Sequence, residues 1–268
     1  MSGLLDQLSP PVRGLILDMD GVLWKDDTPI GDLPKIFNGI RDRNLKVTLA
    51  TNNATKTVDE YLSKLRGLGV ALEPWQIITS SEATADVVEK AFPQKGAVFV
   101  IGENGIISAL REKGFNPITD PDDDSPVLAV VVGIDRGVTY QKLRRATLHI
   151  RAATPFYGTN PDKTFPTPLG LVPGAGAILA SIEAATDIKP IVIGKPAPFM
   201  LELAADRMKL SKGEVLVVGD RLETDIAGGR AMGARTALVL SGVSTESEAD
   251  AWRPGPDLIA TDLAELVN

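Results

Sequence analysis

The sequence contains no cysteine and a single histidine, and both shortages narrow the chemistry available to the chain. Without cysteine there is no disulfide, no thiolate nucleophile and no cysteine-bound zinc. Basic residues are outnumbered as well, because 28 Lys and Arg stand against 35 Asp and Glu, a formal net charge of -7. The chain therefore lacks the basic field of a general nucleic-acid binder, although a small anionic substrate needs only local positive charge.

Long apolar runs are missing too. No run approaches the roughly 20 residues that a membrane-spanning helix needs. The N-terminal stretch 1–11 has no basic region followed by a long apolar core, and so predicts no signal peptide. We expect a cytoplasmic protein with neither a membrane nor a nucleic-acid partner. Its 268 residues suffice for one large domain or two modest ones.

Short apolar runs alternate with amphipathic segments, a pattern that predicts an α/β fold with a Rossmann-like, mostly parallel sheet. Near-continuous apolar strands are typical of sheets that helices cover on both faces. Such strands are expected at Gly14–Asp18, Lys46–Thr51, Ile191–Gly194, Val215–Gly219 and Thr236–Leu240, with an edge strand at Leu258-Ile259. Capping boxes at Thr57–Glu60 and Thr79–Glu82 predict two helix starts.

The middle of the chain predicts a second α/β unit inserted into the first. Its expected strands are Val98–Ile101, Val127–Val132 and Phe156–Gly158. Its expected helices lie near Asn104–Lys113, Thr139–Ala152 and Ala175–Ala185. We expect the outer domain to comprise residues 1–80 and 189–268, and the insertion residues 81–188.

Two carboxylates, Asp18 and Asp20, stand two residues apart at the end of the first expected strand, and Gly21 follows them. Residues at this spacing share one face if the strand continues. Like charges at the end of a buried strand need a cation or a proton to compensate them. Taken alone, the pair is equally compatible with a solvated acidic turn, because Asp and Gly are common turn residues.

Polar segments also follow three other expected strands: Thr51-Asn52-Asn53, Gly194-Lys195-Pro196 and Gly219–Asp225. In open parallel sheets, ligands bind outside the carboxyl ends of the strands. We therefore expect all four segments to meet at one edge of one sheet. Each segment alone has an ordinary explanation as a turn, a helix cap or a surface residue, and it is their joint occurrence that favours a site.

The groups collected there predict phosphoryl-transfer chemistry. Four carboxylates are included, those of Asp18, Asp20, Asp220 and Asp225. Oxygen donors without histidine or cysteine favour a hard cation, and Mg²⁺ fits best. Lys195 offers a compact positive charge for a phosphoryl oxygen, while Thr51 and Asn52 add a hydroxyl and an amide. A cation, a lysine and neutral donors around an acidic cluster are typical of phosphoryl transfer.

These motifs resemble those of the haloacid dehalogenase superfamily, and the resemblance covers nearly the whole chain. It rests on Asp18-Met19-Asp20-Gly21, Thr51-Asn52, Lys195 and Gly219-Asp220 with Thr224-Asp225. The insertion looks like the large α/β cap of the NagD-like, 4-nitrophenylphosphatase branch, and Asn160-Pro161-Asp162 and Pro173-Gly174-Ala175-Gly176 are similar to that branch. Val22 stands where much of the superfamily has threonine, but many members of this branch carry valine.

The resemblance implies a Mg²⁺-dependent phosphatase that hydrolyses small phosphomonoesters through an aspartyl-phosphate. Residues 1–80 and 189–268 would form the catalytic core and residues 81–188 the cap. Asp18 would attack phosphorus. Asp20 would protonate the leaving oxygen and then deprotonate the water that hydrolyses the intermediate.

The resemblance also implies ligands. The metal would be held by the Asp18 carboxylate, the Asp20 backbone carbonyl and Asp220, with Asp225 behind them holding a metal-bound water or Lys195. The phosphoryl group would be held by Thr51, Asn52 and Lys195. Asn160 and Asp162 are candidate substrate contacts from the cap, although a structural turn explains them equally well. A homodimer formed through the cap is a further expectation.

Alternative functions follow from the same residues. A phospho-aspartate receiver-like signalling protein also clusters aspartates, a threonine and a lysine, but the order of the motifs and the large insertion oppose it. A dehalogenase on the same scaffold needs no metal and no acid at position 20, so Asp20 and Asp220 weigh against it. The intact acidic set also weighs against a non-catalytic binding module. Motifs of this kind indicate reaction type better than substrate.

Overall fold

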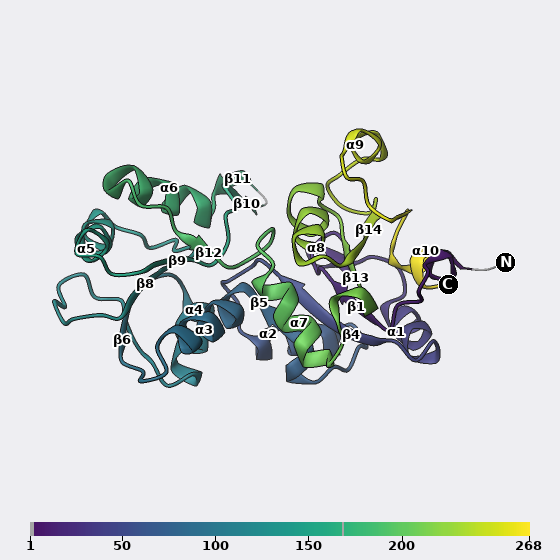
Figure 1. Ribbon diagram of the computed structural model, residues 1–268, viewed down its shortest axis with the longest axis horizontal. Helices are drawn as coiled ribbons and strands as arrows, with labels where there is room; N and C mark the ends of the chain where they lie inside the picture. The colour runs from purple at the N-terminus through teal and green to yellow at the C-terminus, as the bar shows by residue number, and fades with distance from the viewer. Residues whose placement is uncertain (1–2, 168) are drawn as a thin grey trace. The chain divides into compact units, whose positions relative to one another are not determined.

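The computed structural model describes residues 3–167 and 169–268, which fold into two compact units (Figure 1). The first unit takes in the chain up to Thr51, together with Val58–Ile78 and Lys195–Asn268. The second unit takes in Asn52–Thr57 and Thr79–Gly194. The expected α/β fold class is confirmed. The predicted domain limits, after residues 80 and 188, and the roles of core and cap stay predictions.

A six-stranded sheet forms the centre of the first unit. Its order is β15 (Leu258–Ala260), β14 (Arg235–Val239), β13 (Val215–Gly219), β1 (Gly14–Leu17), β4 (Lys46–Thr51) and β5 (Ile77–Thr79). Parallel pairing joins β15 through β4, and Leu17 lies opposite both Val218 and Leu49. Every residue of β1 and β13 is buried, as expected for central strands of a parallel sheet.

Helices and short turns complete the first unit. The helices are α1 (Leu33–Asp42), α2 (Val58–Gly67), α7 (Phe199–Met208), α8 (Ala227–Met232), α9 (Glu246–Ala251) and α10 (Leu263–Val267). A small hairpin, β2 (Trp24–Lys25) with β3 (Thr28–Pro29), follows β1. Single 3-10 turns lie at Leu4–Gln7, Pro74–Gln76 and Lys212–Glu214, and a π-helical turn at Leu222–Ile226.

Helix α1 illustrates how local sequence produces these elements. The Asp32 carboxylate accepts the backbone N–H of Lys35 at 3.1 Å and so caps the first turn. The helix then buries apolar residues at helical spacing, Leu33, Ile36, Phe37 and Ile40. These side chains belong to the same hydrophobic cluster as Leu15 and Leu17 of β1, so α1 is anchored to the sheet core.

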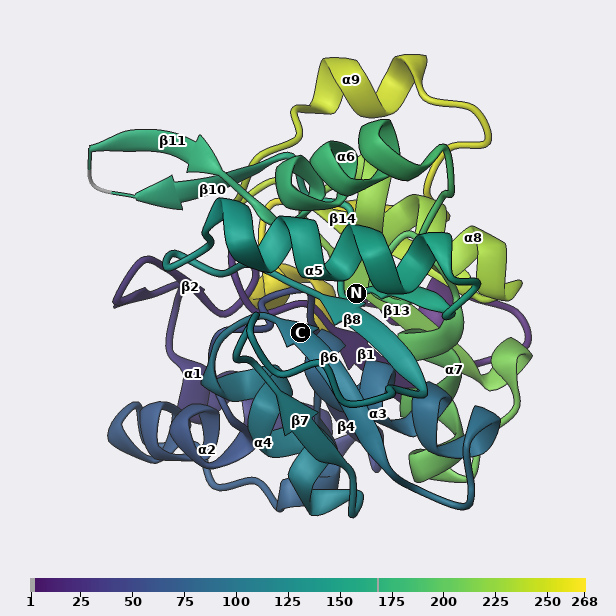
Figure 2. The same cartoon turned by 90° about the vertical axis from the view of Figure 1, so that its left-hand side faces the viewer.

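The second unit has a five-stranded parallel sheet of its own. Its order is β12 (Ile191–Val192), β9 (Phe156–Gly158), β8 (Ala129–Val132), β6 (Ala97–Ile101) and β7 (Asn116–Ile118). Figure 2 shows α3 (Ser80–Ala91) and α4 (Asn104–Glu112) on one side of this sheet, with α5 (Tyr140–Arg151) and α6 (Ala175–Thr186) on the other. The hairpin of β10 (Thr164–Thr167) and β11 (Gly170–Pro173) extends from the unit in the same view.

The structure confirms most predicted elements and corrects one placement. The predicted cap of α3 is confirmed, because Thr79 Oγ1 accepts the Glu82 N–H at 3.1 Å. The prediction that Ile191–Gly194 is a strand of the same sheet as β1 is wrong. Only Ile191-Val192 is a strand, and it pairs with Tyr157-Gly158 of the second unit. A two-residue strand carries no periodicity from which its partner can be deduced.

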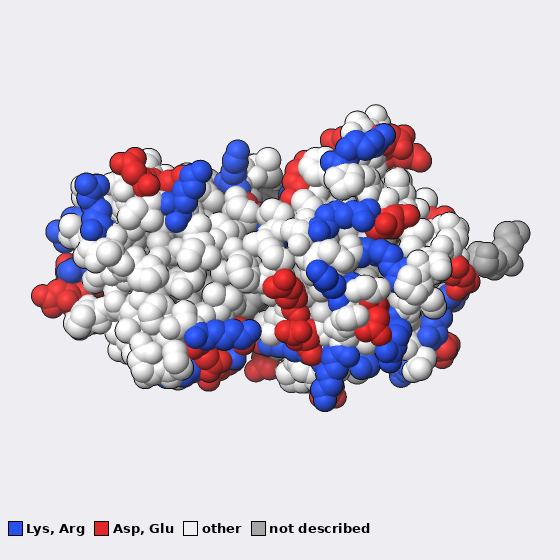
Figure 3. Space-filling model, in the orientation of Figure 1, with Lys and Arg blue, Asp and Glu red and all other residues white. Residues whose placement is uncertain are grey.

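The surface and the helix lengths agree with the composition. On the face of the first unit drawn in Figure 3, lysine and arginine are interspersed with aspartate and glutamate and form no extended basic surface. Within 3–167 and 169–268, no helix combines the length and the apolar character needed to cross a membrane.

Candidate active site

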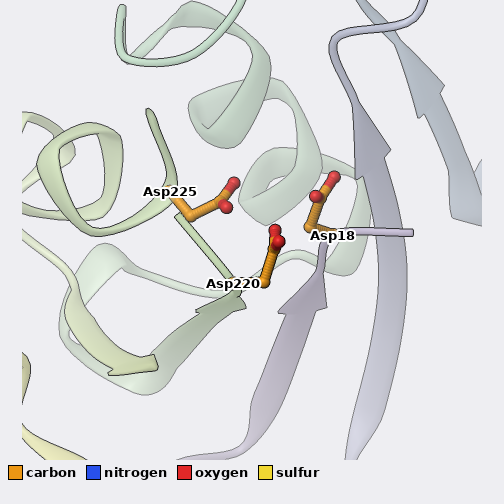
Figure 4. Close-up of side chains that lie close together, drawn as sticks. All are labelled: Asp18, Asp220 and Asp225. Carbon is orange, nitrogen blue, oxygen red and sulfur yellow. The ribbon is translucent and has the colours of Figure 1, made fainter. Parts of the chain in front are cut away.

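Three carboxylates converge at the carboxyl ends of β1 and β13 (Figure 4). Asp18 follows β1, Asp220 follows β13, and Asp225 lies in the π-helical turn just beyond. One oxygen from each residue lies within 4.8 Å of one from each of the others. Asp220 and Asp225 are each 1% exposed. We call these three residues the carboxylate cluster.

Two glycines make room for Asp220. A Cβ at Gly21 or at Gly242 would collide with the Asp220 carboxylate, and Gly21 also has a φ of +81°, which favours glycine. Asp220 Oδ2 accepts the Val243 N–H at 2.8 Å. Its Oδ1 is buried and has no hydrogen-bond donor among the described atoms. A buried carboxylate oxygen without a donor is costly, and a cation would satisfy it.

Lys195 ties the cluster together. Its Nζ lies 2.7 Å from Asp18 Oδ1 and 2.7 Å from Asp225 Oδ1, and it donates to the Ala50 carbonyl of β4 at 2.9 Å. The residue is only 3% exposed. A lysine is rarely buried unless it is paired, so its position depends on these acceptors.

The pKa values report burial first and neighbouring negative charge second. Burial raises the pKa of Asp18 well above its ordinary value; Lys195 opposes the rise, and the charges of Asp225 and Asp220 add to it. Burial, followed by the Asp225 charge, raises the pKa of Asp220 to about 6. Three carboxylates face one ammonium group. A divalent cation would balance the remainder, and the oxygen-only donor set fits Mg²⁺.

Asp20 lies apart from the carboxylate cluster. Met19 between the two aspartates is fully buried, whereas the Asp20 side chain is exposed. Asp20 Oδ1 accepts the indole N–H of Trp24 at 2.9 Å. Thr51, at the end of β4, is buried in the same unit. The expected acidic pair is therefore divided, with one member largely buried beside Lys195 and the other facing solvent.

A second group of candidate residues gathers within the second unit. Asn52 is its first residue, and the Asn52 backbone carbonyl accepts from Asn160 Nδ2 and from Ser80 Oγ, both at 2.7 Å. Asn52 Nδ2 lies 3.4 Å from each carboxylate oxygen of Asp162. The Asp162 N–H in turn donates to Asn160 Oδ1 at 3.1 Å. The structure thus joins Asn52, Asn160 and Asp162 into one network.

The loop after β14 was missing from the expected site. Besides Val243, it contributes Ser244, whose N–H donates to the Asp220 carbonyl at 3.0 Å. It also contributes Ser241, whose hydroxyl donates to the Gly21 carbonyl at 2.7 Å. A signal for this loop was present, because the run at 236–240 was predicted as a parallel strand whose carboxyl end falls at the same edge. Trp24 was missed too, and no motif or spacing signalled it.

Comparisons with known proteins agree with this geometry. A family model described as haloacid dehalogenase-like hydrolase matches residues 15–116, and another described as HAD-hydrolase-like matches residues 192–266. Phosphoglycolate phosphatase 1A, chloroplastic, of Arabidopsis thaliana is 35% identical over 284 aligned positions, which cover 98% of this chain and 78% of that protein.

Solved structures extend the likeness to three dimensions. NagD of E. coli K-12 superposes with a TM-score of 0.86 at 31% identity, covering 95% of this chain and 98% of that one. The glycerol phosphate phosphatase Rv1692 of Mycobacterium tuberculosis, solved in complex with magnesium, superposes with a TM-score of 0.89 at 30% identity. That alignment covers 100% of this chain and 79% of the other.

Proposed function

The chain belongs to the haloacid dehalogenase-like hydrolase family, in its NagD-like branch, and on this basis we propose a Mg²⁺-dependent phosphatase that hydrolyses small phosphomonoesters through an aspartyl-phosphate. The expected family and a phosphatase of this type are confirmed. One observation carries the mechanism: Lys195 pairs with Asp18 inside a buried cluster in which Asp220 keeps an oxygen without a donor.

Asp18 is the proposed nucleophile. Its side chain is 12% exposed, so it is accessible although largely buried. Lys195 orients the carboxylate through Oδ1 at 2.7 Å, and one carboxylate oxygen forms the bond to phosphorus while the other is available to the metal. As that bond forms, the bond from phosphorus to the leaving oxygen breaks. The product of this half-reaction is an aspartyl-phosphate on Asp18.

Asp20 is the proposed general acid and base. In the first half-reaction it gives its proton to the leaving oxygen. In the second half-reaction Asp20 takes a proton from the water that attacks phosphorus. The bond between phosphorus and the Asp18 oxygen breaks, so inorganic phosphate is released and the Asp18 carboxylate is restored. Its exposed side chain, two residues from the nucleophile, suits a group that must reach both the leaving oxygen and a water.

The Asp18 carboxylate, the Asp20 backbone carbonyl and Asp220 are the proposed Mg²⁺ ligands. The ion, when bound, supplies positive charge opposite the phosphoryl oxygens. Asp225 lies within reach of the same site, but its 2.7 Å pairing with Lys195 supports a different role. We assign Asp225 to holding the lysine in place.

Thr51, Asn52 and Lys195 are the proposed contacts of the phosphoryl group, as the match to the family motifs suggests. The second unit is the proposed cap, with Asn160 and Asp162 as candidate substrate contacts. Two of the relatives named above are described as phosphatases of phosphoglycolate and of glycerol phosphate. We propose a substrate of that size class, a short phosphorylated metabolite.

The partner and location follow as further parts of the proposal. A homodimer through the second unit is supported by hairpin β10–β11, where Leu169 and Leu171 are 99% and 73% exposed. Exposed apolar surface is a feature of protein interfaces. A cytoplasmic location is proposed on the basis of the sequence, and size-exclusion chromatography with light scattering tests the dimer.

The decisive experiment is phosphate release from a panel of phosphomonoesters, with and without Mg²⁺. We expect turnover of at least one short alkyl phosphate and its loss after exhaustive chelation, with recovery when Mg²⁺ is restored. Turnover that survives chelation would contradict the metal site. A long-lived phosphoprotein without turnover would support the receiver-like alternative, and metal-independent halide release from a haloacid would support the dehalogenase.

A further inference from the structure

A buried tryptophan holds the exposed carboxylate of Asp20. The indole N–H of Trp24 donates to Asp20 Oδ1 at 2.9 Å, and Trp24 itself is only 1% exposed. The backbones are also joined, because Gly21 N–H donates to the Trp24 carbonyl at 2.7 Å. No other side-chain hydrogen bond of Asp20 is found in the described part of the chain. An exposed carboxylate with one rigid donor owes its orientation to that donor.

The indole also distinguishes the two oxygens of Asp20. Indole Nε1–H is a donor only, so the oxygen that faces it must act as an acceptor. When Asp20 is protonated, its carbonyl oxygen is the better acceptor, so the bond from Trp24 favours Oδ1 as the carbonyl oxygen and Oδ2 as the oxygen that carries the proton. The hydrogen bond therefore does two things: it selects a rotamer, and it favours one oxygen as the carrier of the transferable proton.

Lys64 lies over the face of the same indole. Its Nζ lies 4.3 Å from the centroid of the Trp24 ring, and it donates to the Asp26 carbonyl at 2.8 Å in the turn of hairpin β2–β3. A cation over the face of an indole is attracted by the ring electrons, and withdrawing those electrons makes the N–H a stronger donor. Lys64 thus joins helix α2 to hairpin β2–β3, and Trp24 of that hairpin joins both to Asp20.

We propose that Trp24 is a positioning residue that holds Asp20 Oδ2 ready to give its proton to the leaving oxygen. The inference rests on the proposed function, in which Asp20 is the general acid. It predicts a specific defect when the N–H is lost. The kcat/KM of substrates whose leaving oxygen needs a proton will fall, whereas the kcat/KM of substrates whose leaving group is stable as an anion will not.

Trp24→Phe tests this through the ratio of kcat/KM for two substrates. One is the alkyl phosphate that the unsubstituted enzyme hydrolyses best, with 2-phosphoglycolate and glycerol 3-phosphate tried first; the other is 4-nitrophenyl phosphate, whose phenolate leaves without help. kcat/KM reports only the steps up to the first bond cleavage. We expect a loss of about 30-fold for the alkyl phosphate and under about 3-fold for the aryl phosphate.

Matched variants separate positioning from packing. Trp75→Phe also removes an indole N–H in the same unit, at a side chain that is 41% exposed, and should leave both substrates unchanged. Asp20→Asn should show the same substrate selectivity with a larger amplitude. Adding Trp24→Phe to Asp20→Asn should then cost no further selectivity, as expected when two residues act as a unit.

Equal losses on the two substrates, or no loss on either, would overturn the inference, because a purely structural role lowers the amount of folded enzyme and not the ratio. If Trp24→Phe does not fold, benzothienylalanine at position 24 replaces only the N–H with sulfur and keeps the ring. The proposed function fails separately, if Asp18→Asn keeps turnover or if the unsubstituted enzyme releases no phosphate.

Discussion

The two units share an architecture but differ in the charges that they bury. Both have a parallel sheet covered by helices, yet the buried charged residues of the first unit are Asp220, Asp225 and Lys195, with Asp18 beside them. In the described part of the second unit, Asp135 is the one buried charged residue.

The buried aspartates of the two units are satisfied in different ways. Asp135 accepts from Lys142 Nζ and from the Gly137 N–H, both at 2.8 Å. Asp220, in contrast, keeps a buried oxygen without a donor, and its pKa is raised. A parallel α/β sheet is therefore a scaffold, and the uncompensated charge marks the site.

Asp18→Asn should have the largest effect. An amide cannot attack phosphorus, so we expect kcat to fall by at least about 10,000-fold, while the thermal unfolding temperature does not decrease, because a costly buried charge is removed. Steady-state phosphate release and differential scanning fluorimetry measure the two quantities. Substantial residual turnover would show that Asp18 is not the nucleophile. The functional contrast between the two units would then lose its main support.

Lys195→Met should affect both activity and stability. Removing the ammonium group leaves the carboxylate cluster without its counter-charge, and breaking a buried pair in this way costs about 3 kcal/mol of the free energy of unfolding. We expect kcat/KM to fall by about 1,000-fold, since the phosphoryl group loses its cation. Urea unfolding of the metal-free protein gives the stability, and an unchanged midpoint would contradict the pairing seen here.

The stabilisation that Mg²⁺ provides should depend on pH. In the metal-free folded protein the pKa of Asp220 is raised from 3.8 to about 6. A raised carboxyl pKa means that ionisation destabilises the fold above pH 6, and that this cost is relieved as pH falls through 6 toward 3.8. Protons and Mg²⁺ therefore compete for the same oxygens.

We expect Mg²⁺ to raise the unfolding temperature clearly at pH 7.5 and little at pH 5. Unfolding curves with and without the ion at both values measure this, and Asp220→Asn should remove most of the difference. An equal Mg²⁺ shift at the two pH values would show that the cluster is not where the ion binds.

Lys142→Met is the matched change in the second unit and should have the smallest effect on activity. Its partner Asp135 keeps the Gly137 N–H, so we expect the free energy of unfolding to fall by about 1–3 kcal/mol. kcat/KM should stay within about 2-fold of the starting value. A catalytic loss as large as that of Lys195→Met would mean that buried charge serves the reaction in both units.

Sequence reasoning anticipated the parts of the fold that long patterns encode. The strands of the first sheet other than β5, and the three helices expected between residues 104 and 185, carry enough apolar character or capping to be recognised. Several short elements were missed, among them β5, β7 and both hairpins, because two to four residues contain no period; β9 and β15 are equally short and were recognised by their apolar residues alone. The same brevity explains why β12 was placed in the wrong sheet.

Part of the site follows from the rule that ligands bind at the carboxyl ends of parallel strands. Asp18 and Asp220 follow adjacent parallel strands, so the rule about carboxyl ends places them together. Lys195 follows a strand of the other sheet, so the same rule placed it beside Asp18 on a strand assignment that was wrong, and the family motif supported that position separately. The bond from Trp24 to Asp20 depends on how a four-residue turn folds back, and nothing in the order of residues signals such a contact.

The two glycines that flank Asp220 also limit how this protein can change. Positions 21 and 242 each admit one amino acid if the Asp220 carboxylate is to stay where it is, because even alanine would displace it. Single substitutions of Gly21 and Gly242, which lie far apart in the chain, are therefore expected to disturb the base of the site. Laboratory evolution of new substrates should accordingly collect its changes elsewhere and return glycine at both positions.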